Sequence, residues 1–246
     1  MSTFIVLPTY NEVENLAQLI PLLLKLPQGV HVLVVDDNSP DGTGILADQF
    51  ATENAKRVQV IHRPGKLGLG TAYLAGFRRA LALGAERILT MDADFSHPPR
   101  YIPDLLARGA FADLVIGSRY VVGGRMVDSP LPRHLLSRAA NATARLMLGL
   151  KVRDVTAGFR LYRREVIESI PLDQIFSSGY SFLIEMLFLV ERRSWRVAEV
   201  PVLYYDRRLG ASKISQAEIY KALYTVGRLA LWRLRDYRRA RPARQH

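Results

Sequence analysis

The chain has 246 residues, of which 49% are hydrophobic and 23% charged, and it contains no cysteine. This composition is typical of a packed globular protein and excludes disulfide scaffolds, cysteine-ligated zinc or iron–sulfur sites, and thiol catalysis. The formal net charge is +11, and residues 207–246 carry +9 of it, with eleven Lys or Arg and two acidic residues. This asymmetry predicts that an anionic surface meets the C-terminal end of the chain.

Uncharged segments of the chain are short. A helix that spans a membrane needs about 20 mostly apolar residues, whereas no stretch without Asp, Glu, Lys or Arg exceeds 11 residues, the length of 67–77 and 174–184. The N-terminal run MSTFIVLPTYNE lacks a basic start, and its apolar part has the length of a strand. We therefore predict that it forms the first strand of the fold and is not a signal peptide.

Short β-branched runs alternate with helical patterns along the chain. The predicted strands are 4–7, 30–35, 58–61, 87–91, 114–116 and 197–203, and the predicted helices are 14–25, 43–54, 70–83 and 99–108. This alternation predicts an α/β fold, in which a mostly parallel sheet carries helices on both faces. Ligands of such sheets bind beyond the carboxyl ends of the strands, so the residues that follow each strand are candidates for the site.

Two carboxylates, Asp92 and Asp94, follow the apolar run ILTM and flank Ala93. Side chains at positions i and i+2 of an extended chain point to the same side. Paired carboxylates at a strand end suit a hard divalent cation, which keeps coordination positions open for phosphates. The alternative is helix capping before Pro98 and Pro99.

The segment 36–43, DDNSPDGT, follows the apolar run VLVV. A carboxylate at this strand end could accept a hydrogen bond from the N–H edge of a nucleobase. Turn and N-cap chemistry is an equal alternative, because Ser39, Asp41 and Gly42 satisfy it without a ligand.

The glycine-rich segment 65–70, GKLGLG, resembles a phosphate-binding loop. It lacks the spacing of the Walker A motif and of the dinucleotide-binding motif. Its alternative interpretation is a tight turn into the next helix.

Cations follow in two further places. Arg119 ends the run LVIGSR, and Arg133, Ser137 and Asn141 recur every four residues, so on a helix they share one face. Arginine and hydroxyl groups gathered in this way could cradle an anion, although a solvated polar face is the alternative. The segment 204–213, YYDRRLGASK, could clamp a diphosphate, or it simply adds to the C-terminal charge.

Together these motifs resemble one family along almost the whole chain, the inverting glycosyltransferase family 2 of GT-A fold. Within that family the match is to the polyprenyl (dolichyl) phosphate mannosyltransferases. The residues that carry the resemblance are LPTYNE (7–12), VVDDNSPDGT (34–43), KLGLGTAY (66–73), MDADFSHPP (91–99), GSRY (117–120), RHLLSRAAN (133–141), DVTAGFRLY (154–162), GYSFLIEM (179–186) and YDRRLGASKIS (205–215). The resemblance implies a single GT-A catalytic domain over residues 1–246, with a Rossmann-like nucleotide-binding half.

The resemblance also implies a role for each motif. The donor nucleotide would be bound by Pro8, Tyr10, Glu12, Asp37, Lys66, Gly68, Gly70, Asp92, Ala93, Asp94, Arg207 and Lys213. Asp92 and Asp94 would bring Mg²⁺ or Mn²⁺ to the diphosphate, with Ser96 as a further ligand. Arg119, Arg133 and Ser137 would grip the acceptor phosphate, and with Asp94 they form the implied catalytic set.

The implied reaction is transfer of mannose from GDP-mannose to a polyprenyl or dolichyl monophosphate, with inversion at the anomeric carbon. No strong general base is required, because the second pKa of a phosphomonoester is about 6. A UDP-glucose-dependent polyprenyl phosphate glucosyltransferase is the close alternative, since Asp37 could pair with guanine or with uracil. The motif Q-x-x-R-W is absent, which argues against a processive polysaccharide synthase.

The C-terminal region predicts a helix that meets a membrane. Ser215 and Glu218 form a capping box, and we expect a basic amphipathic helix over 212–237 and a disordered tail over 238–246. Such a helix can lie in a lipid headgroup layer, so we expect a cytoplasmic protein at the membrane periphery, with or without a separate membrane subunit. The alternative is an ordinary helix packed on the domain with a solvated basic edge.

A nucleic-acid-binding protein is the remote alternative, in which the basic tail contacts the phosphates. Residues 238–244 contain no aromatic side chain, and the carboxylates at the strand ends would repel a phosphate backbone. We therefore expect no nucleic-acid partner.

Overall fold

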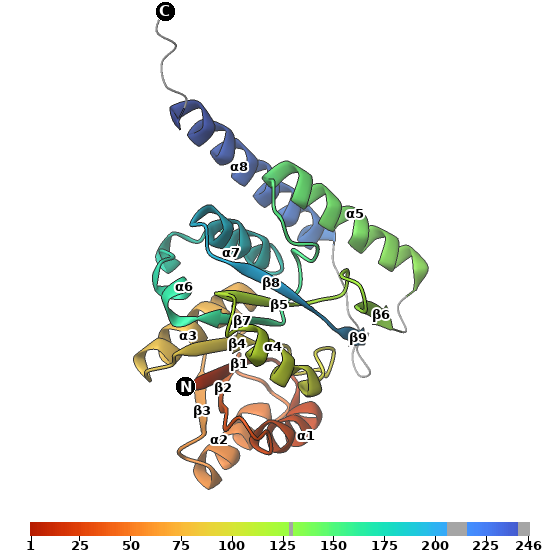
Figure 1. Cartoon of the computed structure of the whole chain (residues 1–246). Coiled ribbons are helices and arrows are strands. Elements are labelled where there is room, and N and C mark those ends of the chain that lie inside the picture. Colours follow the sequence, from red (N-terminus) through yellow and green to blue (C-terminus); the bar gives the residue numbers. More distant parts are fainter. Residues whose placement is uncertain (128–129, 206–215, 241–246) are drawn as a thin grey trace, which may run out of the picture.

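The chain folds as alternating strands and helices, and a computed structural model describes residues 1–127, 130–205 and 216–240 (Figure 1). In chain order the elements are β1 (Thr3–Thr9), α1 (Val13–Leu24), β2 (His31–Asp36), α2 (Thr43–Glu53), β3 (Val58–His62), α3 (Leu69–Ala82), β4 (Arg87–Thr90), η1 (Pro99–Tyr101), α4 (Ile102–Arg108), β5 (Leu114–Ser118), β6 (Arg125–Val127), α5 (Leu131–Leu148), β7 (Arg160–Arg163), α6 (Arg164–Glu168), η2 (Leu172–Gln174), α7 (Ser181–Arg192), β8 (Val197–Pro201), β9 (Leu203–Tyr205) and α8 (Gln216–Ala240).

A seven-stranded sheet with the order β3-β2-β1-β4-β7-β5-β8 forms the centre of the molecule. All its neighbouring strands are parallel except β7, which runs antiparallel to both β4 and β5. The predicted mostly parallel sheet is therefore confirmed. The carboxyl ends of β1, β2, β4 and β5 meet at one edge, where the sequence places its polar segments.

The two faces of the sheet bury two separate apolar cores. Ile5 and Leu7 of β1 pack in a core with α1, α2 and α4, whereas Phe4 and Val6 pack in a core with α3, α6 and α7. Successive side chains of a strand point to opposite faces, so one apolar run supplies both cores. This explains why the strands read as continuous apolar runs rather than alternating ones.

Helices α5 and α8 form a pair at one end of the molecule, beyond α7 (Figure 1). Ala144 and Leu148 of α5 and Val226 and Leu229 of α8 extend the core of α3 and α7. No helix in the described part of the chain is both long enough and apolar enough to cross a bilayer.

Several elements differ from the prediction. The predicted strand 197–203 is two strands, because β8 joins the central sheet while β9 pairs with β6. Helix α8 extends to Ala240, three residues beyond the predicted end, and residues 212–215 and 241–246 lie outside the described residues. The sequence patterns also missed β6, β7, α6 and α7. Helix α7 is buried all round from Ser181 to Val190, so it has no exposed polar face of the kind that marks a surface helix.

Replacement by alanine should have opposite effects on stability at two glycines in helix interiors, Gly76 and Gly227. A Cβ on Gly76 of α3 would lie 2.3 Å from Cγ1 of Val6, whereas a Cβ on Gly227 of α8 would meet nothing within 4 Å. We expect Gly76→Ala to lower the free energy of unfolding by about 1–3 kcal/mol through overpacking. Gly227→Ala should raise it by about 0.5–1 kcal/mol through helix propensity. Denaturant unfolding of both variants measures this, and equal effects would contradict the packing described above.

Candidate active site

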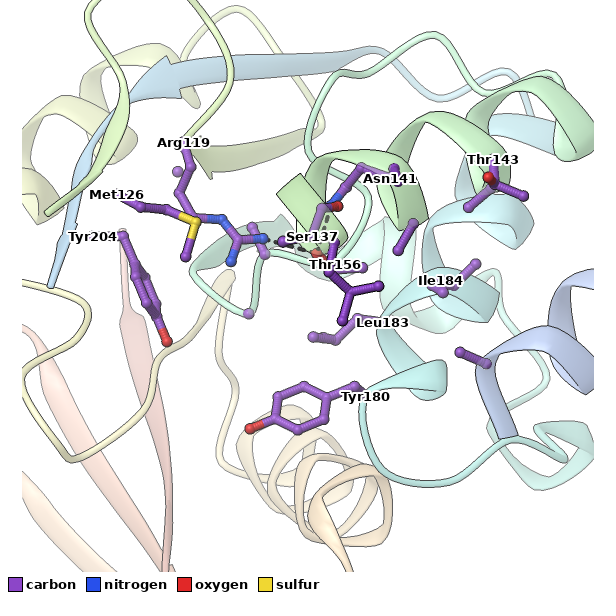
Figure 2. Close-up of a pocket in the computed structure, with 18 of the residues that line it drawn as sticks. Arg119, Met126, Ser137, Asn141, Thr143, Thr156, Tyr180, Leu183, Ile184 and Tyr204 are labelled. Carbon is purple, nitrogen blue, oxygen red and sulfur yellow. Dashed lines mark hydrogen bonds between the residues drawn. The ribbon is translucent and has the colours of Figure 1, made fainter. Parts of the chain in front are cut away.

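A cavity of about 400 Å³ opens at the carboxyl ends of the strands (Figure 2). At one end it is lined by polar side chains, among them Asp92, Arg119 and Ser137. Its other end runs between apolar side chains of α5, α7 and α8, such as Ala144, Ile184 and Val226. The cavity therefore offers charged groups at one end and an apolar wall at the other.

Asp92 and Asp94 follow β4, and Asp92 lines the polar end of the cavity. Asp92 accepts a hydrogen bond from the Tyr73 hydroxyl at 3.2 Å, and Oδ1 of Asp94 accepts from the backbone N–H of Ser96 at 3.0 Å. Burial holds the pKa of Tyr204 well above its usual range, and the negative charges of Asp92 and Asp94 raise this pKa further. Both carboxylates therefore lie close enough to Tyr204 to interact with it. The structure thus brings the two predicted carboxylates to one space, while Ala93 between them is buried in the core.

The backbone between the carboxylates and Ser96 is strained. Phe95 has a φ of 61°, in the left-handed region that bulky side chains rarely adopt. Strain of this kind is found where the surroundings over-determine the backbone, often at active sites. Ser96, on the far side of Phe95, is 1% exposed.

The donor set fits a magnesium or manganese ion that is shared with a substrate. Among the described residues, no group of three His, Cys, Asp or Glu side chains is placed to hold a metal ion by itself. Two carboxylates at a strand end are nevertheless the usual protein contribution to a cation whose remaining ligands are waters and substrate phosphates. Asp92 and Asp94 would hold such an ion, with the buried Ser96 hydroxyl as the neighbouring oxygen.

His97 orders the loop that carries Asp92. Its Nδ1 accepts a hydrogen bond from the backbone N–H of Asp92 at 2.9 Å, and its ring stacks on Phe159 at 5.2 Å. Burial lowers the pKa of His97 even though Asp92 and Asp94 act in the opposite direction. The Nδ1 lone pair is therefore engaged in the loop.

Arg119, directly after β5, is buried at the polar end of the cavity. Its Nε and Nη2 donate to the two carboxylate oxygens of Asp154 at 2.8 and 2.6 Å, and Nη2 also donates to Oγ1 of Thr156 at 2.8 Å. Burial alone would lower the pKa of Arg119, but the Asp154 carboxylate holds it above the usual range. The same pairing lowers the pKa of Asp154 against the effect of burial.

The predicted polar face of α5 lies beside Arg119. Ser137 shares a hydrogen bond of 2.7 Å with the hydroxyl of Tyr120. Asn141 donates to Thr156 and accepts from the backbone N–H of Val155, which fixes α5 to the loop before β7. Arg133 lies one turn before Ser137 in α5, and its side chain is outside the described part of the structure.

The strand end after β2 is used partly for turns and partly for an ion pair. Asp36 accepts from Thr9 and Ser39, and Asp41 accepts from Thr43 and Val13. Although partial burial acts in the opposite direction, these hydrogen bonds lower the pKa of Asp41. The turn interpretation thus holds for Asp36 and Asp41, and the N-cap of α2 is Gly42.

Asp37 is paired instead with the buried guanidinium of Arg63. Nε and Nη2 of Arg63 both contact Oδ1 of Asp37, while Nη1 donates to Thr71 and Nη2 also to the carbonyl of Gly68. This arginine links the segment after β2 to the glycine-rich loop. No sequence motif pointed to Arg63.

The other described residues predicted to bind the donor lie in β1, in the loops after β1 and β3, and in α3. The ammonium of Lys66 lies 4.3 Å from the ring centroid of Tyr10, and Glu12 accepts a hydrogen bond from Asn15. Gly68 precedes α3 with a φ of +96°, and Gly70 packs inside α3 against Phe182. Pro8 lies in β1 beside Val35 of β2. Arg207 and Lys213 lie outside the described residues, directly after β9, whose Tyr204 lines the cavity.

Comparison with known proteins identifies the family. The family model described as glycosyl transferase family 2 matches residues 4–170, more than half of the chain. The chain belongs to glycosyltransferase family 2. This result confirms the family that the motifs resembled.

Two relatives of family 2 cover most of the chain. A polyprenol monophosphomannose synthase of Mycolicibacterium smegmatis is 46% identical over 234 residues, which are 95% of this chain and 87% of the relative. An undecaprenyl-phosphate mannosyltransferase of Micrococcus luteus is 46% identical over 231 residues, which are 94% and 95% of the two chains.

A solved structure confirms the GT-A type of fold. Glucosyl-3-phosphoglycerate synthase of Mycobacterium tuberculosis, in complex with Mn²⁺, UDP and glucosyl-3-phosphoglycerate, matches with a TM-score of 0.67 and 22% identity. The match covers 93% of this chain and 80% of that protein.

Proposed function

We propose that this family 2 enzyme transfers mannose from GDP-mannose to a polyprenyl monophosphate, with inversion at the anomeric carbon. The names of both relatives at 46% identity support mannose transfer to a polyprenyl phosphate. The observation that carries the proposal is the cavity, in which the Arg119 guanidinium and the Asp92 carboxylate lie at one end of an otherwise largely apolar wall. A polyprenyl phosphate has the same division between an anionic head and an apolar chain.

The apolar end of the cavity opens between α5 and α8. Leu136 of α5 and Leu223 of α8 both line the cavity, and they are 53% and 57% exposed. An isoprenoid chain whose phosphate lies at Arg119 can therefore leave the cavity between these two helices. A soluble phosphate acceptor would make no use of this opening.

The reaction is a direct displacement in which an acceptor phosphate oxygen attacks C1 of mannose as GDP leaves. The acceptor phosphate is largely ionised at neutral pH, so no side chain has to remove a proton. Arg119 orients the attacking phosphate through its planar guanidinium, together with Ser137 and Arg133. Asp92 and Asp94 would hold Mg²⁺ or Mn²⁺, which would supply positive charge to stabilise the departing diphosphate. Arg207 and Lys213 would close over that diphosphate from the segment after β9.

A donor-by-acceptor assay tests the proposal. GDP-mannose and UDP-glucose are offered in parallel with a short polyprenyl phosphate and Mg²⁺ or Mn²⁺, and the reaction is repeated with EDTA. We expect GDP-mannose to give a mannosyl lipid and UDP-glucose to give no product. With EDTA, the product from GDP-mannose should be lost. Product from UDP-glucose alone would contradict the sugar and the nucleotide, whereas product in EDTA would contradict the metal.

Replacement of one carboxylate tests the metal site separately. We expect Asp94→Asn to lower turnover by roughly 100-fold or more, because the stabilising charge on the diphosphate is lost. Asp104→Asn, at an exposed position in α4, is the matched control and should keep turnover within about twofold. Thermal unfolding of both variants separates loss of activity from loss of fold. An active Asp94→Asn enzyme would place the metal elsewhere.

The surface of α5 and α8 supports docking on a membrane. Eleven of the nineteen exposed large hydrophobic side chains in the described residues lie on these two helices, including Leu135, Leu146 and Leu231. The exposed cations Lys221, Arg228 and Arg235 lie on α8 among them. Apolar side chains beside cations suit the boundary between acyl chains and anionic headgroups.

Vesicle binding checks this surface. We expect the double variant Leu135→Glu, Leu146→Glu to bind anionic vesicles at least tenfold more weakly, because each buried leucine contributes about 1.5–3 kcal/mol. Ile45→Glu, at a 69% exposed position on α2, is the control. Turnover of a short acceptor dissolved in detergent should be unchanged in all three proteins. Equal vesicle binding by the double variant and the wild type would exclude α5 from the membrane surface.

A further inference from the structure

The guanidinium of Arg119 is enclosed on most of its sides. Asp154 accepts three hydrogen bonds from Arg119: from the backbone N–H at 2.9 Å, from Nε at 2.8 Å and from Nη2 at 2.6 Å. Thr156 accepts a further bond from Nη2. The rings of Tyr120 and Tyr204 lie 5.3 and 5.2 Å from the guanidinium carbon. Within the described residues Nη1 makes no hydrogen bond, so its N–H groups are the ones left for a ligand in the cavity.

We infer that Asp154 is a positioning residue, which aims the Nη1 edge of Arg119 at the acceptor phosphate. The inference rests on the function proposed above. Asp154 is completely buried and does not line the cavity, so it acts on the phosphate only through Arg119. The pair carries no net charge, and its grip on a phosphate therefore depends on the direction of the N–H groups more than on attraction from a distance.

Asp154 is itself held in place from a neighbouring strand. The backbone N–H groups of Arg153 and Asp154 donate to the carboxylate of Glu199 in β8, at 2.8 and 3.0 Å. Arg119 follows β5, and β5 pairs with β8. The arginine and the carboxylate that orients it are thus both fixed to the same part of the sheet. A group whose orientation is fixed before binding loses little freedom when the ligand arrives.

A second ion pair repeats this geometry away from the cavity. Asp113 accepts from the backbone N–H of Arg196 at 2.9 Å, from its Nε at 3.1 Å and from its Nη2 at 3.0 Å. Asp113 precedes β5, whereas Arg119 follows it, so the two pairs lie at opposite ends of one strand. The Arg196 side chain is 64% exposed, against 11% for Arg119. Asp113 therefore serves as a matched control for a buried aspartate in an arginine pair.

Steady-state kinetics of Asp154→Asn test the inference, with KM measured separately for a short polyprenyl phosphate and for GDP-mannose. We expect the acceptor KM to rise about tenfold or more, since an amide cannot accept all three N–H groups and the guanidinium turns away. The donor KM should stay within about twofold. Asp113→Asn should lower the unfolding temperature while both KM values stay within about twofold. A similar rise in donor and acceptor KM for Asp154→Asn would overturn the inference.

A double-mutant cycle shows whether Asp154 acts through Arg119. In the background of Arg119→Met, which alone should raise the acceptor KM, Asp154→Asn should add no further change. An additional rise of the full size would overturn the positioning role. An unchanged acceptor KM in Arg119→Met alone would overturn the acceptor assignment of the proposed function, and this result is distinct from a failure of positioning.

A gentler variant covers the case in which Asp154→Asn does not fold. Thr156→Val keeps the shape of the side chain and removes the acceptor of one Arg119 hydrogen bond. We expect its acceptor KM to rise severalfold with an unchanged donor KM. No change in the acceptor KM of Thr156→Val would then overturn the inference.

Discussion

The completely buried guanidinium of Arg160 holds together three parts of the molecule that meet at the cavity. From β7 it donates to the carbonyls of Val155, Ala157 and Leu183 at 2.7–2.8 Å. A buried charge is tolerated only when hydrogen-bond partners replace its hydrating water molecules. The positions of these three carbonyls are therefore constrained by Arg160. The loop that carries Asp154 and Thr156 is thereby fixed to the sheet on one side and to α7 on the other.

The chemistry of the site follows from where the fold places polar and apolar groups. The carboxyl ends of the strands supply Asp92, Asp94 and Arg119, which are positioned by backbone that the sheet fixes. Helices α5, α7 and α8 supply an apolar wall that continues one of the two cores. At the cavity the core that contains α3 and α7 reaches the carboxyl ends of the strands. The cavity therefore suits a ligand that is anionic at one end and apolar along the rest.

Much of the fold could be predicted from the sequence because its strands are short β-branched runs between amphipathic helices. Strand β7 and helix α7 could not, and for opposite reasons. Strand β7 has the sequence RLYR, and its first arginine is buried only because three backbone carbonyls surround it. Helix α7 is buried on every side, and periodicity alone does not distinguish such a largely apolar run from a buried strand.

The candidate site was predictable to a similar extent. Asp92, Asp94, Arg119 and Ser137 were found by motif, and the structure places all of them except Asp94 in the lining of one cavity. The ion-pair partners of Arg119 and of Asp37 were missed. Asp154 lies 35 residues from Arg119, and Arg63 lies 26 residues from Asp37. No local spacing reveals an ion pair over such distances. Tyr73 and Tyr204 read as ordinary aromatic residues until the fold places them beside the two carboxylates.

The proposed mechanism requires the acceptor phosphate and the donor diphosphate to occupy one cavity together. An acceptor phosphate oxygen then displaces the diphosphate oxygen from C1 of mannose in a single step. The anomeric configuration of the product tests this claim most directly, and NMR of the purified mannosyl lipid made from α-linked GDP-mannose measures it. We predict a β-linked mannosyl phosphate, because a direct displacement inverts the anomeric carbon. An α-linked product would contradict the claim, since net retention requires two displacements or a different attacking face.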